Sequence, residues 1–112
     1  MQLKRLTPEL SVAPQIALED LPAAAAAGFT TLICNRPDGE QPGQPSAESV
    51  RAAVEAAGLE FRYVPVVSGQ ITEQDVADHA AALDSLPGPV FAYCRSGARC
   101  ANLFALAREN RG

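Results

Sequence analysis

The chain has 112 residues, which is enough for one domain and leaves no room for a second hydrophobic core. Hydrophobic residues make up 47% of it, as in an ordinary globular protein, and the net charge of −4 argues against the basic face that nucleic acid requires. No apolar run reaches the ~20 residues of a membrane span, and residues 1–5 lack the apolar core of a signal peptide. We therefore expect a single cytoplasmic domain over residues 1–112 that binds neither membrane nor nucleic acid.

The sequence contains three cysteines, Cys34, Cys94 and Cys100. An odd number in a cytoplasmic chain favours free thiols over a disulfide framework. A zinc site would need these thiols to converge with His79, but no two of them form a Cys-x-x-Cys pair. We expect no metal and no other cofactor, with Cys34 in the core and His79 exposed or partly hydrogen-bonded.

Strand-like and helix-like segments alternate along the chain. Glycines and helix-capping residues mark the boundaries: Gly28 and Gly58 end two helices, while Ser46 and Thr72 begin two others. In chain order, the sequence predicts strands at 2–6 and 10–13, a helix at 18–27, a strand at 29–34, a loop at 35–45, a helix at 46–57, a strand at 61–67, a helix at 72–85, a turn at 86–89, a strand at 90–93 and a helix at 98–110.

This alternation predicts an α/β fold in three layers, with a mostly parallel sheet flanked by helices. In such sheets, ligands bind at the carboxyl ends of the strands. The segments 34–38 and 67–70 and the loop that begins at Cys94 all follow predicted strands. We therefore expect them to share one rim of the sheet.

Cys94 is the predicted nucleophile. It ends an apolar strand and precedes a tight turn, and a helical pattern begins at once afterwards. Backbone N–H groups at a helix N-terminus bind anions, and the same position lowers the pKa of a cysteine, whose thiolate is the nucleophile. The alternative is a buried, inert cysteine at a strand end.

The residues after Cys94 supply the predicted anion-binding groups. Gly97 permits a turn in which consecutive N–H groups point inward, and Arg99 can form a two-pronged contact with an oxyanion, unless it is a surface arginine. Arg95 points outward or contacts the far end of a substrate, and Ser96 tightens the turn. The substrate-binding candidates of this loop are Arg95, Ser96, Gly97, Ala98 and Cys100.

Two resemblances follow from these motifs. The loop Cys-Arg-x-Gly-x-Arg resembles the active-site loop of rhodanese sulfurtransferases. The series Asn-Arg-Pro-Asp-Gly-Glu at 35–40, Gln-Pro-Ser at 44–46, Val-Pro-Val at 64–66 and the Cys94 loop resembles the DUF442 family, the phosphatase-like domain of beta-lactamase-hydrolase-like proteins. This second resemblance implies a dual-specificity-phosphatase-like fold. It also implies partners among sulfide- or persulfide-oxidising enzymes.

The sequence departs from the phosphatase pattern His-Cys-x5-Arg in three ways. Tyr93 replaces the histidine, and only four residues separate Cys94 from Arg99. A shorter loop gives a smaller ring, which favours a terminal sulfur over a tetrahedral phosphate. Where phosphatases carry a general-acid aspartate, this chain has Ser68, which cannot donate a proton near neutral pH as a carboxylic acid can.

The loop after the second buried strand offers a substitute. Asp38 is either the acid or a turn residue, because Pro-Asp-Gly is a favoured turn sequence. Arg36 has two possible roles: it forms an ion pair with Asp38 or Glu40, or it completes a positive rim. Asn35 caps the loop or faces the substrate. Cys100 occupies a position where related loops carry a Ser or Thr that assists the nucleophile. It assists Cys94 through its S–H, traps it as a disulfide or persulfide, or packs as a small apolar residue.

The leading functional hypothesis is a sulfurtransferase that moves sulfane sulfur through a Cys94 persulfide, with Arg99 holding an anionic donor. Such a transfer has a good leaving group and needs no acid. The alternative is a cysteine-dependent phosphatase acting on phosphate monoesters, with Asp38 as the acid. A further alternative is a non-catalytic module that binds an anion or a persulfide. In each case the expected ligand is a small anion: thiosulfate, a persulfide or a phosphate ester.

Overall fold

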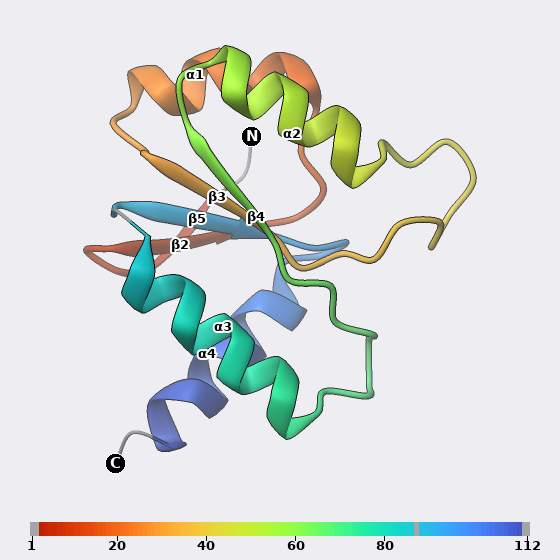
Figure 1. Cartoon of the computed structure of the whole chain (residues 1–112), viewed down its shortest axis with the longest axis vertical. Coiled ribbons are helices and arrows are strands. Elements are labelled where there is room, and N and C mark those ends of the chain that lie inside the picture. The colour runs from red at the N-terminus through yellow and green to blue at the C-terminus, as the bar shows by residue number, and fades with distance from the viewer. Residues whose placement is uncertain (1–2, 87, 111–112) are drawn as a thin grey trace.

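A computed structural model describes residues 3–86 and 88–110 of the chain. A five-stranded sheet lies between two helical layers, with α1 and α2 over one face and α3 and α4 over the other (Figure 1). This arrangement confirms the expected three-layer α/β fold. Residue 2 of the first expected strand and residue 87 of the expected turn lie outside the described residues.

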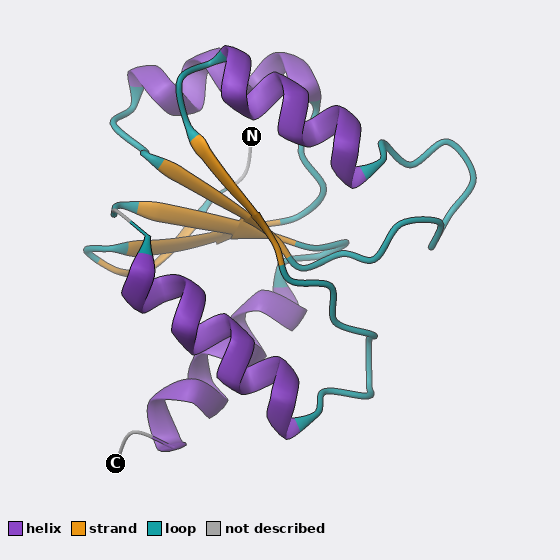
Figure 2. Ribbon diagram, in the orientation of Figure 1, coloured by secondary structure: helices purple, strands orange, loops and turns teal. Residues whose placement is uncertain are grey.

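The elements follow the predicted order with small shifts at their ends. Residues 18–27, expected as one helix, divide into a 3₁₀ turn and a short α-helix. The elements are β1 (Lys4–Thr7), β2 (Leu10–Ala13), η1 (Leu18–Asp20), α1 (Leu21–Ala26), β3 (Thr31–Cys34), α2 (Ala47–Ala56), β4 (Glu60–Tyr63), α3 (Glu73–Ser85), β5 (Val90–Tyr93) and α4 (Ala98–Asn110). Figure 2 shows how long loops connect β3 to α2 and β4 to α3.

The sheet has the strand order β1-β2-β5-β3-β4. β1 pairs with β2 in antiparallel fashion, and all other pairs are parallel. In the register of β3 and β5, Cys34 lies opposite Tyr93. Asn35 and Cys94, the next residues of these two strands, therefore leave the same edge of the sheet together.

Alternating side chains of the central strands fill a core on each face. Leu32 and Phe91, which are partners in the register, pack toward α1 and α2. Ile33 and Ala92, the next pair, pack on the opposite side. Because β3 and β5 are buried on both faces, their sequences are nearly all apolar, which is what made them recognisable as buried strands.

Side-chain caps begin two helices where the sequence predicted them. The Ser46 hydroxyl accepts a hydrogen bond from the Ser49 N–H at the start of α2, and Thr72 forms a reciprocal capping box with Asp75 at the start of α3. β4 ends at Tyr63 rather than at residue 67. Pro65, which has no N–H to donate to a sheet, follows two residues later.

His79 corrects one expectation. It lies on α3 with no exposed surface, and neither ring nitrogen has a hydrogen-bond partner. Burial lowers the pKa of His79 from 6.5 to about 4, so the ring is neutral in the folded protein. Within residues 3–86 and 88–110, no helix combines the length and apolar character of a membrane span.

We expect the protein to lose stability as the pH falls from about 6.5 to about 4. In that window the unfolded state takes up a proton at His79 that the folded state does not accept, which costs about 3 kcal/mol by pH 4. Urea unfolding of the wild type and of His79→Leu at several pH values measures this. The variant should show a flatter dependence over this window, and two parallel curves would contradict the prediction.

Candidate active site

Cys94 lies immediately after β5, at the carboxyl edge of the sheet. Its N–H donates to the Ala13 carbonyl, and its Sγ accepts a hydrogen bond from the Gly97 N–H at 3.0 Å. Gly97 has a φ of +90°, and a Cβ at this position would lie 3.4 Å from the backbone of Ala13. A side chain is therefore disfavoured at Gly97, and the turn directs the Gly97 N–H at the sulfur, whereas the Ala98 N–H donates to the Ser96 hydroxyl.

The environment of Cys94 stabilises its thiolate. A side-chain hydrogen bond from Cys100 lowers the pKa of Cys94 to about 5 against the effect of burial, with help from backbone hydrogen bonds of Cys100, Ser96 and Gly97. The hydrogen bond to Cys94, followed by burial, raises the pKa of the Cys100 thiol, so Cys100 keeps the proton that the pair shares. Of the three interpretations of Cys100, these opposite pKa shifts of the two thiols support assistance to the nucleophile.

Arg99 lies in the first turn of α4 and is 8% exposed. Its Nη1 donates to Glu40 Oε2 and to the Val66 carbonyl, both at 2.9 Å, and its Nη2 donates to Glu40 Oε1 at 3.3 Å. The predicted two-pronged contact therefore exists, but its acceptor is a carboxylate of the same chain. The Nε atom is buried and has no partner.

Glu40 lies between two arginines. Its Oε1 also accepts from Arg36 Nε at 2.9 Å, which settles the pairing of Arg36 in favour of Glu40. The other Arg36 nitrogens donate to Gln15 and Gln41, so Arg36 is 3% exposed with all its polar groups engaged. Partial burial acts to raise the pKa of Glu40, but hydrogen bonds from Arg99 and Arg36 outweigh it and hold the pKa below its ordinary value.

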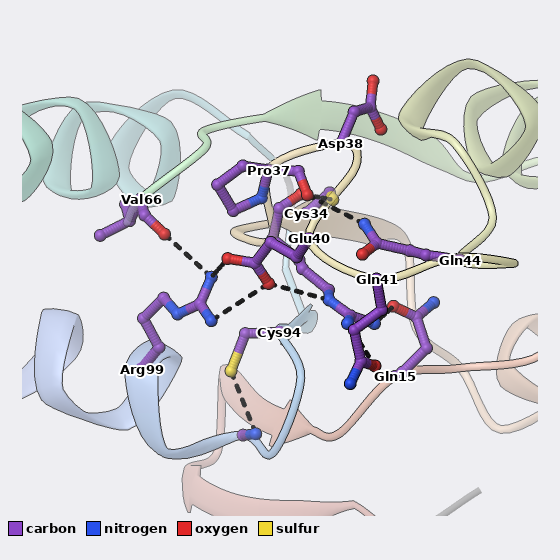
Figure 3. A network of polar contacts seen from close by, with 12 residues as sticks. Gln15, Cys34, Pro37, Asp38, Glu40, Gln41, Gln44, Val66, Cys94 and Arg99 are labelled. Carbon is purple, nitrogen blue, oxygen red and sulfur yellow. Dashed lines mark hydrogen bonds and ion pairs between the residues drawn. The ribbon is translucent and has the colours of Figure 1, made fainter. Parts of the chain in front are cut away.

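In Figure 3, the Glu40 carboxylate lies beside the Arg99 guanidinium and above Cys94 in the view. The sequence prediction did not include Glu40 among the site residues. It considered Glu40 only as a possible partner of Arg36 and did not consider its pairing with Arg99. Two arginines at one sheet rim, Arg36 and Arg99, need an acceptor when they are buried, and Glu40 is the carboxylate at the end of the 35–40 motif.

Asp38 lies elsewhere. Its Oδ1 accepts from the Ala47 N–H at 2.7 Å, at the first residue of α2, and its own N–H donates to the Tyr63 hydroxyl at 3.1 Å. In Figure 3 its carboxylate points away from Cys94. The structure therefore supports the turn interpretation of Asp38, with an added role at the N-terminus of a helix. Its service as an acid stays a prediction.

Three further residues discussed in the sequence analysis are buried beside the site. Asn35 is fully buried and donates through Nδ2 to the Val64 carbonyl, which ties the loop after β3 to the segment after β4. Cys34 is buried in the core, as expected, and its thiol donates to the Arg36 carbonyl at 3.4 Å. Tyr93 belongs to the core on the α1 and α2 side, whereas Cys94 belongs to the opposite side. Its hydroxyl is thus directed away from the nucleophile.

Four more predicted residues gather around a small hollow beside the Cys94 loop. Its volume is about 150 Å³, and Arg99 contributes to its wall. The predicted residues that line it are Ser68, Arg95, Ser96 and Ala98. The hollow thus joins the 67–70 segment to the Cys94 loop, two of the three segments expected at one rim, and no residue of 34–38 lines it. Among residues 3–86 and 88–110, no three metal-ligating side chains converge.

Residues 2–110 match the family described as the phosphatase-like domain of beta-lactamase hydrolase-like proteins. The chain belongs to this family. A beta-lactamase hydrolase-like protein of Agrobacterium fabrum is 38% identical over 112 residues, which is 100% of this chain and 26% of that protein. The chain thus spans about a quarter of the length of the curated relatives it matches. The family confirms the resemblance seen in the 35–40, 44–46 and 64–66 motifs.

Solved structures place the fold among phosphatases. A protein of Neisseria meningitidis, provisionally described as a phosphatase, superposes with a TM-score of 0.89 at 35% identity, over 96% of this chain and 77% of the other. The core catalytic domain of a PP-IP phosphatase of S. cerevisiae, in complex with citrate, superposes with a TM-score of 0.72 at 13% identity. The match covers 96% of this chain and 64% of that domain. The second likeness concerns the fold alone. The dual-specificity-phosphatase-like fold is thereby confirmed.

We expect Cys94 to react as a thiolate at mildly acidic pH, because its pKa is about 5. The rate of its alkylation by iodoacetamide, followed by mass spectrometry against pH, measures that pKa. Cys100→Ala removes the side-chain donor and should raise the midpoint, whereas Cys100→Ser, with a hydroxyl donor, should raise it less. A midpoint unchanged in Cys100→Ala would contradict the role given to Cys100.

Asp38→Ala should destabilise the fold by about 1 kcal/mol, because it removes the acceptor at the N-terminus of α2. Asp38→Asn keeps an oxygen acceptor and should lose less. Urea unfolding at pH 7 measures both variants against the wild type. Equal stability of Asp38→Ala and the wild type would show that this hydrogen bond contributes nothing.

Proposed function

We propose that this domain is an enzyme in which Cys94 takes a group from a small anionic substrate and holds it covalently. The Cys94 thiol, with a pKa of about 5 and an N–H donor at 3.0 Å, is the observation that carries this proposal. At neutral pH such a thiol is a thiolate, which is the nucleophilic form. The N-terminus of α4 adds backbone donors that favour an anionic substrate at the same place.

One candidate reaction is hydrolysis of a phosphate monoester. The family and the structural relatives support it better than they support sulfur transfer. The Cys94 sulfur would attack phosphorus, forming an S–P bond as the ester oxygen leaves, and water would then release phosphate. The leaving oxygen benefits from a proton, which requires an acid near the substrate.

The side chains of this site favour a different reaction. Both carboxylates of the 35–40 motif already have partners. Asp38 accepts a hydrogen bond from the N-terminus of α2, and Glu40 forms ion pairs with Arg36 and Arg99. Glu40, with its lowered pKa, is ionised at neutral pH and has no proton to give. Ser68, at the position where the resemblance to phosphatases implies an acid, lines the hollow beside the Cys94 loop and cannot replace a carboxylic acid.

We therefore propose that the chain transfers sulfane sulfur, with the phosphatase as the second candidate. The Cys94 thiolate attacks the sulfane sulfur of thiosulfate or of a persulfide. An S–S bond forms at Cys94 while the donor's S–S bond breaks, and its electron pair leaves with sulfite or with a thiolate. A second nucleophile then removes the outer sulfur and restores the Cys94 thiolate. Cytoplasmic sulfide- or persulfide-oxidising enzymes are the proposed partners.

Incubation with thiosulfate, followed by intact-mass measurement, tests the first half of this reaction. The wild type should gain the mass of about one sulfur atom on Cys94, and cyanide should remove it as thiocyanate. Cys94→Ser should show neither. Cys100→Ser is the matched control, because it removes a buried thiol beside Cys94 and should retain the adduct.

Three outcomes separate the candidates. A Cys94 persulfide and thiocyanate support sulfur transfer. Turnover of an aryl phosphate, inhibited by vanadate and without any sulfur adduct, would replace sulfur transfer by the phosphatase. A Cys94 thiol that reacts with neither substrate, nor with iodoacetamide at pH 6, would leave an anion-binding module without catalysis.

A further inference from the structure

Glu40 occupies the two Nη groups of Arg99, the residue for which the sequence predicted a two-pronged contact with an oxyanion. Both Nη groups of Arg99 donate to the Glu40 carboxylate, and Nη1 also donates to the Val66 carbonyl. The contact joins residues that are 59 positions apart in sequence. It is therefore built by the tertiary fold and is not a local surface pair.

The donors left for a substrate are few. Arg99 Nε is buried and has no acceptor, although Arg99 is 8% exposed and lines the 150 Å³ hollow. The Arg99 guanidinium has five N–H groups, of which Glu40 and Val66 accept three. The Nε–H and one Nη2–H remain for a substrate, together with the backbone N–H groups of the Cys94 loop.

The charges close to the sulfur also cancel. Arg36 and Arg99 supply two positive charges, and Glu40 and the Cys94 thiolate supply two negative ones. Arg95 adds one more positive charge at the exposed rim, where solvent screens it. A substrate thus enters a nearly neutral site rather than a strongly positive one.

We propose that Glu40 sets the charge selectivity of the Cys94 site, so that the site prefers groups carrying at most one negative charge over dianions. This deepens the proposed function, on which it rests for the identity of the reacting group. A thiol persulfide carries at most one charge at its reacting end, whereas thiosulfate carries two and a phosphate monoester nearly two at pH 7. Glu40 accordingly favours a persulfide as the sulfur donor.

Sulfate and methanesulfonate provide the test, because they share a tetrahedral sulfur–oxygen end and differ by one charge. Calorimetry measures their dissociation constants with the wild type, Glu40→Gln and Glu40→Asp at fixed ionic strength. Protection of Cys94 from iodoacetamide, read by mass spectrometry, shows that each anion binds beside the sulfur. None of these measurements involves sulfur or phosphoryl transfer, so a failed thiosulfate assay would not alter them.

We expect the wild type to bind methanesulfonate at least as tightly as sulfate. Glu40→Gln keeps a carbonyl oxygen for the arginines but removes the charge, and should tighten sulfate binding by about tenfold while changing methanesulfonate less. Glu40→Asp keeps the charge and should keep the wild-type preference. If Glu40→Gln does not fold, the ratio of the dissociation constants of sulfate and methanesulfonate for the wild type still tests the proposal.

Two results would overturn the proposal. Strong preference of the wild type for sulfate would show that Glu40 does not reduce the affinity for dianions. Weaker or unchanged sulfate binding in Glu40→Gln, or none in either protein, would show that the carboxylate only holds Arg99 in position.

Discussion

The parallel register of β3 and β5 is the constraint on which the site depends. It aligns Cys34 with Tyr93, so the two chains leave the sheet side by side at Asn35 and Cys94. The Asn35 N–H donates to the Tyr93 carbonyl, and its side chain holds the segment after β4 through Val64. Without that alignment, the loop that carries Glu40 would not reach the helix that carries Arg99.

Glu40 makes two buried arginines compatible with the fold. Removing a guanidinium from water is costly unless it is paired and fully hydrogen-bonded. Arg36 meets this condition through one carboxylate and two glutamine side chains, and Arg99 meets it apart from its Nε. The same carboxylate therefore supports the loop structurally and limits what Arg99 can offer a ligand. The two carboxylate oxygens of Glu40 therefore bear both on the stability of the 35–40 loop and on the donors that Arg99 can offer a ligand.

Local patterns were sufficient for the fold, because helix caps, glycine stops and apolar runs are short-range features. Ser46, Thr72 and the strand at 90–93 lie where the sequence indicated them. The partners of the site residues were less predictable, since they depend on which loops meet. Asp38 and Glu40 are two residues apart, yet one faces α2 and the other faces Arg99. His79 similarly shows that a helical position alone does not reveal burial.

The short loop and the second thiol are consequences of the same spacing. With four residues between Cys94 and Arg99, Cys100 follows in the first turn of α4, close enough to hydrogen-bond the Cys94 sulfur. A thiol donates a weaker hydrogen bond than a hydroxyl, but here it is buried and holds its proton firmly. The negative charge is thus confined to Cys94, the member of the pair that accepts the Gly97 N–H.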